Sequence, residues 1–412
     1  MKFSKLSQLF LVSSIGLVVA TLLTACQLVS IDYVYVASAA GSASGTTGQI
    51  DIFAADAASG ALRFSLPAVS SGGVAPVALA VSPNYLNLYV ANQGTSDNLV
   101  HLAITIGSGA LTQKDVVTGF GTPVSIAVNQ AASFLFAAFY QGPGANSATV
   151  AALPLASDGT ISNSASPITL LVPGHSGDTI VPTGVFALAN NKAVYVTAYD
   201  QSVYNPSGTV VSGDTANPGW VFGFSVGTNG ALTPLAGSPY EAGVKPSSLA
   251  ADPTSRFLYV TDFASTQMIG YTIMSDSTLV AFLAPPTATG NEPGAITIDP
   301  RGLFVYVANE LDSTVSSYAL NLANGSPTLV ATPVSGPVNP TGTEPVALVV
   351  DPSLGRFLYT ANYLDNSVTG FRLQPTSGIL SPTQATPYPS GGQPTAIVAV
   401  PNGNHEVQSV TP

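Results

Sequence analysis

The stretch Pro293-Gly-Ala-Ile-Thr-Ile-Asp-Pro-Arg-Gly-Leu-Phe-Val-Tyr-Val-Ala-Asn-Glu-Leu-Asp-Ser-Thr-Val315 contains two short apolar runs separated by a turn that begins at Asp299-Pro300. Both runs are rich in β-branched or aromatic residues, which favours strands. A proline opens an equivalent apolar run seven times along the chain, at Pro76, Pro123, Pro182, Pro246, Pro293, Pro345 and Pro394. These prolines are 47 to 64 residues apart. A repeat of about 50 residues built from short strands is typical of a β-propeller.

Each repeat is expected to form one blade of four short antiparallel strands. The proline opens the first strand, where its missing N–H costs no ladder bond. The second strand carries an aromatic anchor, at Tyr35, Tyr89, Phe136, Tyr195, Tyr259, Tyr306 and Tyr359. An alternating third strand and a glycine-led fourth strand follow, as in Gly230-Ala-Leu-Thr-Pro. The turns after the first strands hold or adjoin Arg256, Arg301 and Arg356, which are expected to be solvated.

The two ends of the chain predict how the ring closes. The propeller begins at a second strand, Asp32 to Ser38, with no proline-led strand before it. It ends with an orphan first strand, Thr395 to Val400. Together these ends complete one blade, so we expect an all-β, seven-bladed propeller over residues 32–400, closed by a C-terminal strand that joins the N-terminal blade, with a tail over 401–412. Closure protects strand edges that would otherwise favour aggregation.

The N-terminal segment resembles a bacterial lipoprotein leader. Lys2 and Lys5 precede an apolar run, Phe10 to Leu23, and the sequence Leu23-Thr-Ala-Cys26 resembles a lipobox. We therefore predict a signal peptide over residues 1–25, lipidation of Cys26 and a short lipidated segment over 26–31; an ordinary signal peptide or an uncleaved anchor are the alternatives. Cys26 is the single cysteine and has no disulfide partner. Gln27 follows it in place of an aspartate, which favours the outer membrane or cell surface over the inner membrane.

Charge and composition limit the partners. The sequence has 10 basic and 21 acidic residues, a net charge of -11, and only 8% charged residues. Nucleic-acid binding needs clustered Lys and Arg, so it is not expected. The expected partners are the membrane, through the anchor at Cys26, and a protein, peptide or carbohydrate ligand. A monomer is expected.

One face of the ring is predicted to hold the functional site. Each proline-led entry shares this face, here called the top face, with the residues that end the second strand. The two residues after each proline are small or apolar and uncharged, and charge appears just before the proline, at Lys245, Glu292 and Glu344. The predicted ligand-binding residues are Lys245, Asp262, Glu292, Asn309, Glu344 and Asn362. A solvated polar rim is the alternative.

The histidines give a weaker signal. His175, in Pro173-Gly-His-Ser-Gly177, is the one histidine expected near the top face; His101 falls in a third strand and His405 in the tail. The sequence has no Cys/His cluster with zinc spacing and no glycine-rich phosphate loop. No metal site and no cofactor are therefore predicted.

The segment Asp299–Val315 and the pair Ala137-Ala-Phe-Tyr140 and Ala148-Thr-Val-Ala-Ala-Leu-Pro-Leu155 resemble the lactonase family of seven-bladed propellers, which includes 6-phosphogluconolactonase. The resemblance covers essentially the whole mature chain, and the blade pattern is shared with YVTN-repeat propellers of surface layers. It implies a lactonase-type site, with Glu310 retained from the family's Asn-Glu-Leu motif and His175 a loose match to a His-x-Gly stretch. Where the family has Gly-Pro-Arg-His, this chain has Glu292-Pro-Gly-Ala295. Its Pro-Cys-His and His-Pro-His segments correspond to Pro123-Val-Ser and Val181-Pro-Thr-Gly184.

Three functions remain open at this point. The first is an extracytoplasmic, lipid-anchored propeller that binds a ligand through its top face without catalysis. The second is a lactone hydrolase of altered specificity, acting on a neutral or cationic lactone, with Glu310 and His175 as catalytic residues and Glu310 as the base. The third is a structural repeat of the cell envelope. A phosphorylated sugar lactone is not expected, because it would require arginine clamps and a cytosolic location.

Overall fold

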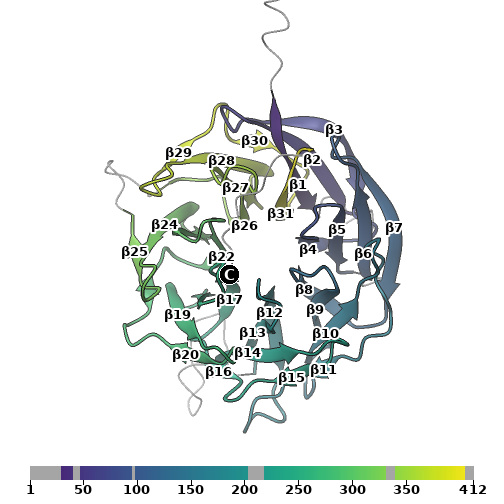
Figure 1. Ribbon diagram of the computed structural model, residues 1–412, viewed down its shortest axis with the longest axis vertical. Helices are drawn as coiled ribbons and strands as arrows, with labels where there is room; N and C mark the ends of the chain where they lie inside the picture. Colours follow the sequence, from purple (N-terminus) through teal and green to yellow (C-terminus); the bar gives the residue numbers. More distant parts are fainter. Residues whose placement is uncertain (1–28, 40–46, 95–97, 203–217, 331–338, 404–412) are drawn as a thin grey trace, which may run out of the picture.

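The computed structural model describes residues 29–39, 47–94, 98–202, 218–330 and 339–403. All the regular secondary structure in these residues is β-strand. The strands form seven antiparallel sheets arranged around a common axis (Figure 1). The prediction of a seven-bladed, all-β propeller is confirmed.

The seven prolines lie at or near the start of the seven innermost strands, as predicted. Those strands are β31 (Pro394–Pro401), β4 (Pro76–Val81), β8 (Thr122–Val128), β12 (Ile180–Ala187), β17 (Pro246–Ala251), β22 (Pro293–Ile298) and β26 (Pro345–Val350). Each inner strand contacts the inner strand on either side, so these seven form a closed ring.

The second strands carry the predicted aromatic anchors, and all seven anchors are buried. The strands are β1 (Ser30–Ser38), β5 (Asn87–Asn92), β9 (Phe134–Tyr140), β13 (Ala193–Asp200), β18 (Phe257–Asp262), β23 (Phe304–Asn309) and β27 (Phe357–Asn362). The third strands are β2 (Gln49–Asp56), β6 (Asn98–Ile104), β10 (Ala148–Pro154), β14 (Gly219–Val226), β19 (Gln267–Ile273), β24 (Thr314–Leu320) and β28 (Ser367–Leu373).

The outer strands vary most in length. They are β3 (Leu62–Ser70), β7 (Leu111–Thr118), β11 (Ile168–Thr169), β15 (Leu232–Pro234), β20 (Leu279–Ala281), β25 (Pro327–Leu329) and β29 (Leu380–Pro382). In three blades a further two-residue strand pairs with the third strand: β16 (Tyr240–Glu241), β21 (Thr287–Ala288) and β30 (Tyr388–Pro389). We number the blades 1 to 7 along the chain by their second strands, from β1 to β27.

The ring closes as the sequence predicts. Blade 1 has the order β3-β2-β1-β31, three strands from the N-terminal part of the chain and one from the C-terminal part. Strand β1 begins at Ser30, two residues before the predicted start, and β31 ends at Pro401. Seven hydrophobic clusters lie between neighbouring blades, one at each interface, and the cluster joining blades 7 and 1 includes Phe357 and Val34. Burial of apolar side chains between blades therefore continues around the whole ring.

The tyrosine anchors also connect the blades through their hydroxyl groups. The Tyr89 hydroxyl donates to the carbonyl oxygen of Gly159 in blade 3 at 2.9 Å, and that of Tyr359 donates to the Gly60 carbonyl in blade 1 at 2.8 Å. Tyr35, Tyr195 and Tyr259 make the same kind of bond to the turn before the outer strand of the next blade. The exception is Tyr306, whose buried hydroxyl has no hydrogen-bond partner among the described residues.

We expect Tyr89→Phe to lower the free energy of unfolding by about 1–2 kcal/mol, because it leaves the buried Gly159 carbonyl without its partner. Tyr306→Phe removes a hydroxyl that has no such bond, so it should change stability by much less. Urea unfolding of both variants measures the difference. Equal losses in the two variants would show that the inter-blade hydrogen bond contributes nothing.

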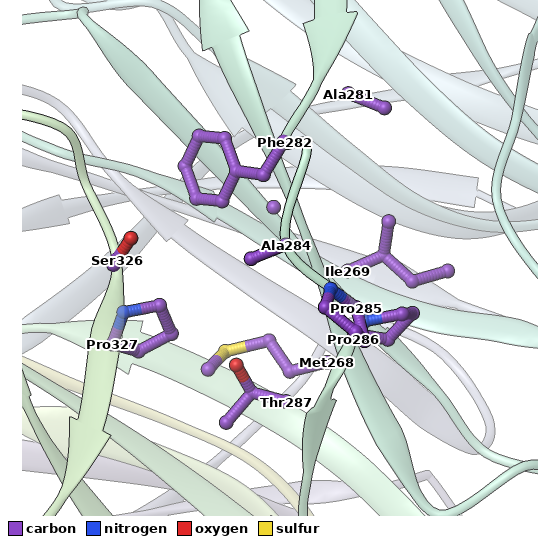
Figure 2. A pocket seen from close by; sticks show the side chains of 11 residues that line it. Met268, Ile269, Ala281, Phe282, Ala284, Pro285, Pro286, Thr287, Ser326 and Pro327 are labelled. Carbon is purple, nitrogen blue, oxygen red and sulfur yellow. The ribbon is translucent and has the colours of Figure 1, made fainter.

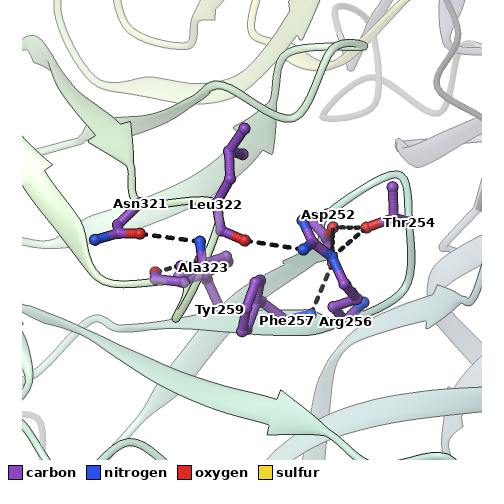
Figure 3. Close-up of polar contacts among 9 residues, drawn as sticks. Asp252, Thr254, Arg256, Phe257, Tyr259, Asn321, Leu322 and Ala323 are labelled. Atoms are coloured by element: carbon purple, nitrogen blue, oxygen red, sulfur yellow. Dashed lines mark hydrogen bonds and ion pairs between the residues drawn. The ribbon is translucent and has the colours of Figure 1, made fainter.

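The turns at the face opposite the top face are fixed by buried aspartates. Asp252 accepts hydrogen bonds from the backbone N–H groups of Arg256 at 2.6 Å and Phe257 at 2.7 Å. Arg256 in turn donates to the carbonyl oxygen of Leu322 in blade 6 at 2.8 Å (Figure 3). Arg301 likewise pairs with Asp299 and donates to the Pro375 carbonyl of blade 7. Arg256 is exposed, as expected, and Arg301 is half-buried; both also bridge neighbouring blades.

A buried carboxyl lies where the two ends of the chain meet. Asp32 of β1 is fully buried, and its Oδ1 accepts a hydrogen bond from the Ser353 hydroxyl at 2.5 Å, while Oδ2 has no partner among the described residues. Burial, and then the nearby charge of Asp351, raises the pKa of Asp32 to about 8. Burial raises the pKa of Asp351 as well, and the four backbone N–H bonds that Asp351 accepts oppose this rise. With a pKa of about 8, Asp32 is mainly protonated at neutral pH.

Asp32→Asn should become increasingly stable relative to the wild type as pH rises. The wild-type carboxyl binds its proton more tightly when folded, so its contribution to stability is complete below the unfolded pKa of 3.8 and is lost as pH rises to about 8. The difference in unfolding free energy should grow by about 1.4 kcal/mol per pH unit across that window. Denaturant unfolding from pH 4 to 9 measures it, and parallel stability curves would contradict this assignment.

No helix in the described part of the chain is long and apolar enough to cross a membrane. The predicted signal peptide and Cys26 fall in residues 1–28, and His405 falls in 404–412, all outside the described residues.

Candidate functional site

The top face is built by one backbone arrangement that recurs in several blades. The residue after the second strand donates its N–H to the carbonyl oxygen of the residue before the proline, as from Glu310 to Glu292 at 2.9 Å and from Tyr363 to Glu344 at 2.8 Å. Phe263 and Lys245 form the same pair at 2.9 Å. This bond brings the two sets of predicted rim residues side by side.

Hydroxyl groups of the inner strands are used to join the blades. The side chain of Thr183 donates to the Pro246 carbonyl at 2.7 Å, Ser247 to the Pro293 carbonyl at 2.6 Å, and Thr395 to the Pro76 carbonyl at 2.6 Å. The small residues after the prolines therefore have a structural role that the sequence did not reveal. Their engaged hydroxyls are poor candidates for nucleophiles.

Glu310 occupies the space next to Gly294 on the inner strand β22. Its Oε1 lies 1.8 Å from the position that a Cβ on Gly294 would take, so no larger side chain fits there with the carboxylate in place. In the lactonase pattern an arginine stands at this position. Here the glycine leaves room for the Glu310 carboxylate to reach the inner wall.

Glu310 lies within electrostatic range of charged side chains from three consecutive blades. Burial raises the pKa of Glu310 to about 7, the neighbouring carboxylates of Glu344 and Glu292 add to the rise, and the Lys245 ammonium opposes it. The structure thus brings together four of the predicted residues, Lys245, Glu292, Glu310 and Glu344, which we call the acidic cluster. A carboxyl with a pKa near 7 can both accept and release a proton at neutral pH.

Lys245 lies in blade 5, packed against aromatic rings. Its Nζ is 4.2 Å from the centre of the Phe263 ring and 5.8 Å from that of Tyr199. Burial lowers the pKa of Lys245, while the charges of Glu310 and Glu292 act in the opposite direction. The aromatic rings stabilise the ammonium in this position.

The other three predicted ligand-binding residues are fully buried and hydrogen-bonded within their own blades. Asp262 accepts the N–H groups of Val244 and Lys245. Asn309 donates to the hydroxyls of Thr314 and Ser316, and Asn362 donates to those of Ser367 and Thr369. The hydrogen-bonding groups of these side chains are therefore used within the blades.

His175 belongs to a different cluster, in blade 4. Its Nδ1 lies 2.8 Å from Oδ2 of Asp178 and 3.3 Å from Oδ2 of Asp200, and its ring meets Trp220 edge-on at 5.3 Å. Burial raises the pKa of Asp200, and the Asp178 carboxyl contributes to the rise. We call these three residues the His175 cluster. Asp200 ends the second strand of its blade, β13, but the sequence gave no reason to combine it with His175 and Asp178.

A cavity of about 330 Å³ lies between the outer strands of blades 5 and 6 (Figure 2). Its walls include Met268, Ile269, Phe282, Pro286 and Pro327. None of the residues that line it is ionisable. It offers no ionisable group for acid or base catalysis, so it is not the candidate catalytic site.

Comparisons with known proteins agree with this fold. The family model "Lactonase, 7-bladed beta-propeller" matches residues 33–178 and 215–406. A periplasmic gluconolactonase of Pseudomonas aeruginosa is 22% identical with a TM-score of 0.69, over 90% of this chain and 99% of that one. A candidate 6-phosphogluconolactonase from Bacteroides uniformis is 18% identical with a TM-score of 0.70, over 90% of this chain and 100% of that one. Among curated proteins, the comparison finds no match.

Proposed function

The chain belongs to the lactonase family of seven-bladed β-propellers, and on that premise we propose that it hydrolyses an uncharged or cationic lactone with Glu310 as the general base. The observation that carries the proposal is the placement of the Glu310 carboxylate against Gly294 on the inner strand, with its pKa raised to about 7 by burial and neighbouring carboxylates. A base with a pKa near the working pH is the most effective one.

Two members of the acidic cluster, Glu310 and Lys245, take part in the proposed reaction. The Glu310 carboxylate removes a proton from a water molecule while the water oxygen attacks the lactone carbonyl carbon. The Lys245 ammonium stabilises the negative charge that develops on the carbonyl oxygen. When the tetrahedral intermediate collapses, the ester bond breaks, the proton held by Glu310 passes to the ring oxygen, and a hydroxy acid is released.

The charges around Glu310 favour a substrate without a phosphate group. Three carboxyl groups and one ammonium form the acidic cluster, so a phosphorylated lactone would meet an excess of negative charge. The neighbour from Pseudomonas aeruginosa is named a periplasmic gluconolactonase, which also supports an unphosphorylated lactone and a location outside the cytoplasm.

Hydrolysis of glucono-δ-lactone and 6-phosphoglucono-δ-lactone by the purified protein tests this proposal. Acid release is followed in a pH-stat, with the spontaneous rate subtracted. We expect turnover of the uncharged lactone and a much lower kcat/KM for the phosphorylated one. Preference for the phosphorylated lactone would contradict the assignment of substrate charge, and failure to hydrolyse any lactone in a wider neutral and cationic panel would contradict the activity.

A second candidate is binding without turnover, the first hypothesis of the sequence analysis. It is favoured by the inner wall, where the hydroxyls of Thr183, Ser247 and Thr395 are engaged between blades and few groups remain for chemistry. The ligand would be a protein, peptide or carbohydrate at the top face of a monomer. If Glu310→Gln binds a sugar or peptide as tightly as the wild type, and neither protein hydrolyses lactones, binding is the function.

We further propose that the protein is exported and anchored through lipidated Cys26, in the outer membrane or at the cell surface. The lipobox-like sequence Leu23-Thr-Ala-Cys26 supports the anchor. Expressed in a bacterium that processes lipoproteins, the wild type should incorporate radioactive palmitate and Cys26→Ser should lose it. Ser14→Ala in the apolar run serves as the control and should keep the label. Label retained by Cys26→Ser would contradict the assignment.

A further inference from the structure

The His175 cluster joins three metal-ligating side chains from two separate segments of blade 4. His175 and Asp178 lie in the connection between β11 and β12, and Asp200 is the last residue of β13. One ligand atom from each residue lies within 4.8 Å of the other two. The three ligand atoms are therefore brought together by the fold, not by the spacing of the residues in the sequence.

The surrounding hydrogen bonds fix this arrangement. The Asp178 N–H donates to the His175 carbonyl at 3.2 Å, and the Gln201 N–H donates to the Thr179 carbonyl at 2.8 Å, which ties the connection to the end of β13. Oδ1 of Asp200 accepts the Ser202 N–H at 2.8 Å, while Oδ2 faces His175. The edge contact with Trp220 adds a further constraint on the imidazole ring.

The degree of burial of the three side chains in the His175 cluster is suitable for binding a cation. The Asp200 side chain is fully buried, whereas the side chains of His175 and Asp178 are 19% and 35% exposed to solvent. Two carboxylates held together repel each other, and a divalent cation between them removes that repulsion. The partial exposure of the other two residues leaves a route by which an ion can enter.

We propose that His175, Asp178 and Asp200 bind a divalent transition-metal ion, for which Zn²⁺ is the probe. Imidazole nitrogen and carboxylate oxygen are ligands that Zn²⁺ accepts at about 2.0–2.2 Å, so neighbouring ligand atoms of one ion are roughly 3–3.5 Å apart. The present separations from Nδ1, 2.8 and 3.3 Å, need only small adjustments. Three protein ligands leave a fourth position for water.

This metal site is independent of the lactone chemistry proposed above, because it shares no residue with the acidic cluster. No metal site was predicted from the sequence, because His175, Asp178 and Asp200 do not follow a recognisable ligand spacing. A bound ion would cross-link the connection before β12 to the end of β13 through its ligands. If the ion binds only the folded chain, it also raises the apparent free energy of unfolding once the free ion concentration exceeds Kd.

Isothermal titration of the EDTA-treated full chain with ZnCl₂ tests the proposal. We expect one saturable site, and Co²⁺ in the same site should give visible absorption bands of a low-coordinate ion. His175→Ala and Asp178→Asn should each weaken Zn²⁺ binding by at least about 100-fold, since even substitutions outside the ligand shell cost 10- to 100-fold. Asp276→Asn, at an exposed position of the turn before β20, is the control and should bind like the wild type.

Circular dichroism of each variant checks that the propeller is intact before affinities are compared. The absence of saturable Zn²⁺ binding to the wild type would overturn the proposal. Binding that is unchanged in folded His175→Ala and Asp178→Asn would also overturn it, because the ion would then occupy another part of the chain.

Discussion

Glu310→Gln should lower kcat/KM for an uncharged lactone by about 100- to 10,000-fold, the range that a positioned general base contributes. The amide keeps the size and shape of the side chain but cannot take a proton from water. Initial rates in the pH-stat measure the loss. Substrate affinity should change little, because the variant removes a step of the reaction rather than a contact with the lactone.

Glu292→Gln provides the matched control for this loss, since it removes a carboxylate from the same cluster that the proposed mechanism does not use as a base. Its activity should stay within about 10-fold of the wild type, with a lower pKa for Glu310 because one repelling charge is gone. If Glu310→Gln and Glu292→Gln have the same small effect, Glu310 is not the base.

Gly294→Ala should reduce kcat/KM by about 100-fold without unfolding the protein. The added methyl group would occupy the place of the Glu310 carboxylate, whose Oε1 lies 1.8 Å from that position, so the carboxylate must move. Displacement of a catalytic group by about 1 Å can cost a factor of this size. The obstacle is the end of a flexible side chain, so stability should change by no more than about 1 kcal/mol.

Gly184→Ala, on the inner strand of blade 4, is the control for Gly294→Ala. A methyl group there would approach Leu249 and Thr197 and would not touch Glu310. Steady-state rates and thermal unfolding of both variants distinguish displacement of the base from damage to the ring. Full activity in Gly294→Ala would mean that the position of the Glu310 carboxylate does not matter for catalysis.

The sequence predicted the fold well because the relevant signals are local. The proline, the apolar run and the aromatic anchor recur within each repeat, and both ends of the chain lack complementary strands. The hydrogen bonds between blades could not be predicted in the same way. The bond from Tyr89 to Gly159 and that from Ser247 to Pro293 join residues of neighbouring repeats, and their geometry depends on how the blades pack.

The candidate site was predicted only in part, for a related reason. Lys245 and Glu310 were identified from their place at the top face, and the structure brings them into electrostatic contact. Asn309 and Asn362 occupy the same rim in sequence, yet their side chains turn into the blade to satisfy buried hydroxyls. The direction of a side chain at the end of a strand cannot be read from its position in the repeat. Asp200 was likewise separated from His175 by 25 residues and one strand.

The pH dependence of kcat/KM for an uncharged lactone tests the role of Glu310 most directly. In the wild type, activity should rise with pH through an inflection near 7, as the Glu310 carboxyl loses its proton. Glu344→Gln removes the neighbouring carboxylate with the largest effect on this pKa, so its inflection should lie at lower pH. An inflection that Glu344→Gln leaves unmoved would contradict the assignment of Glu310 as the base.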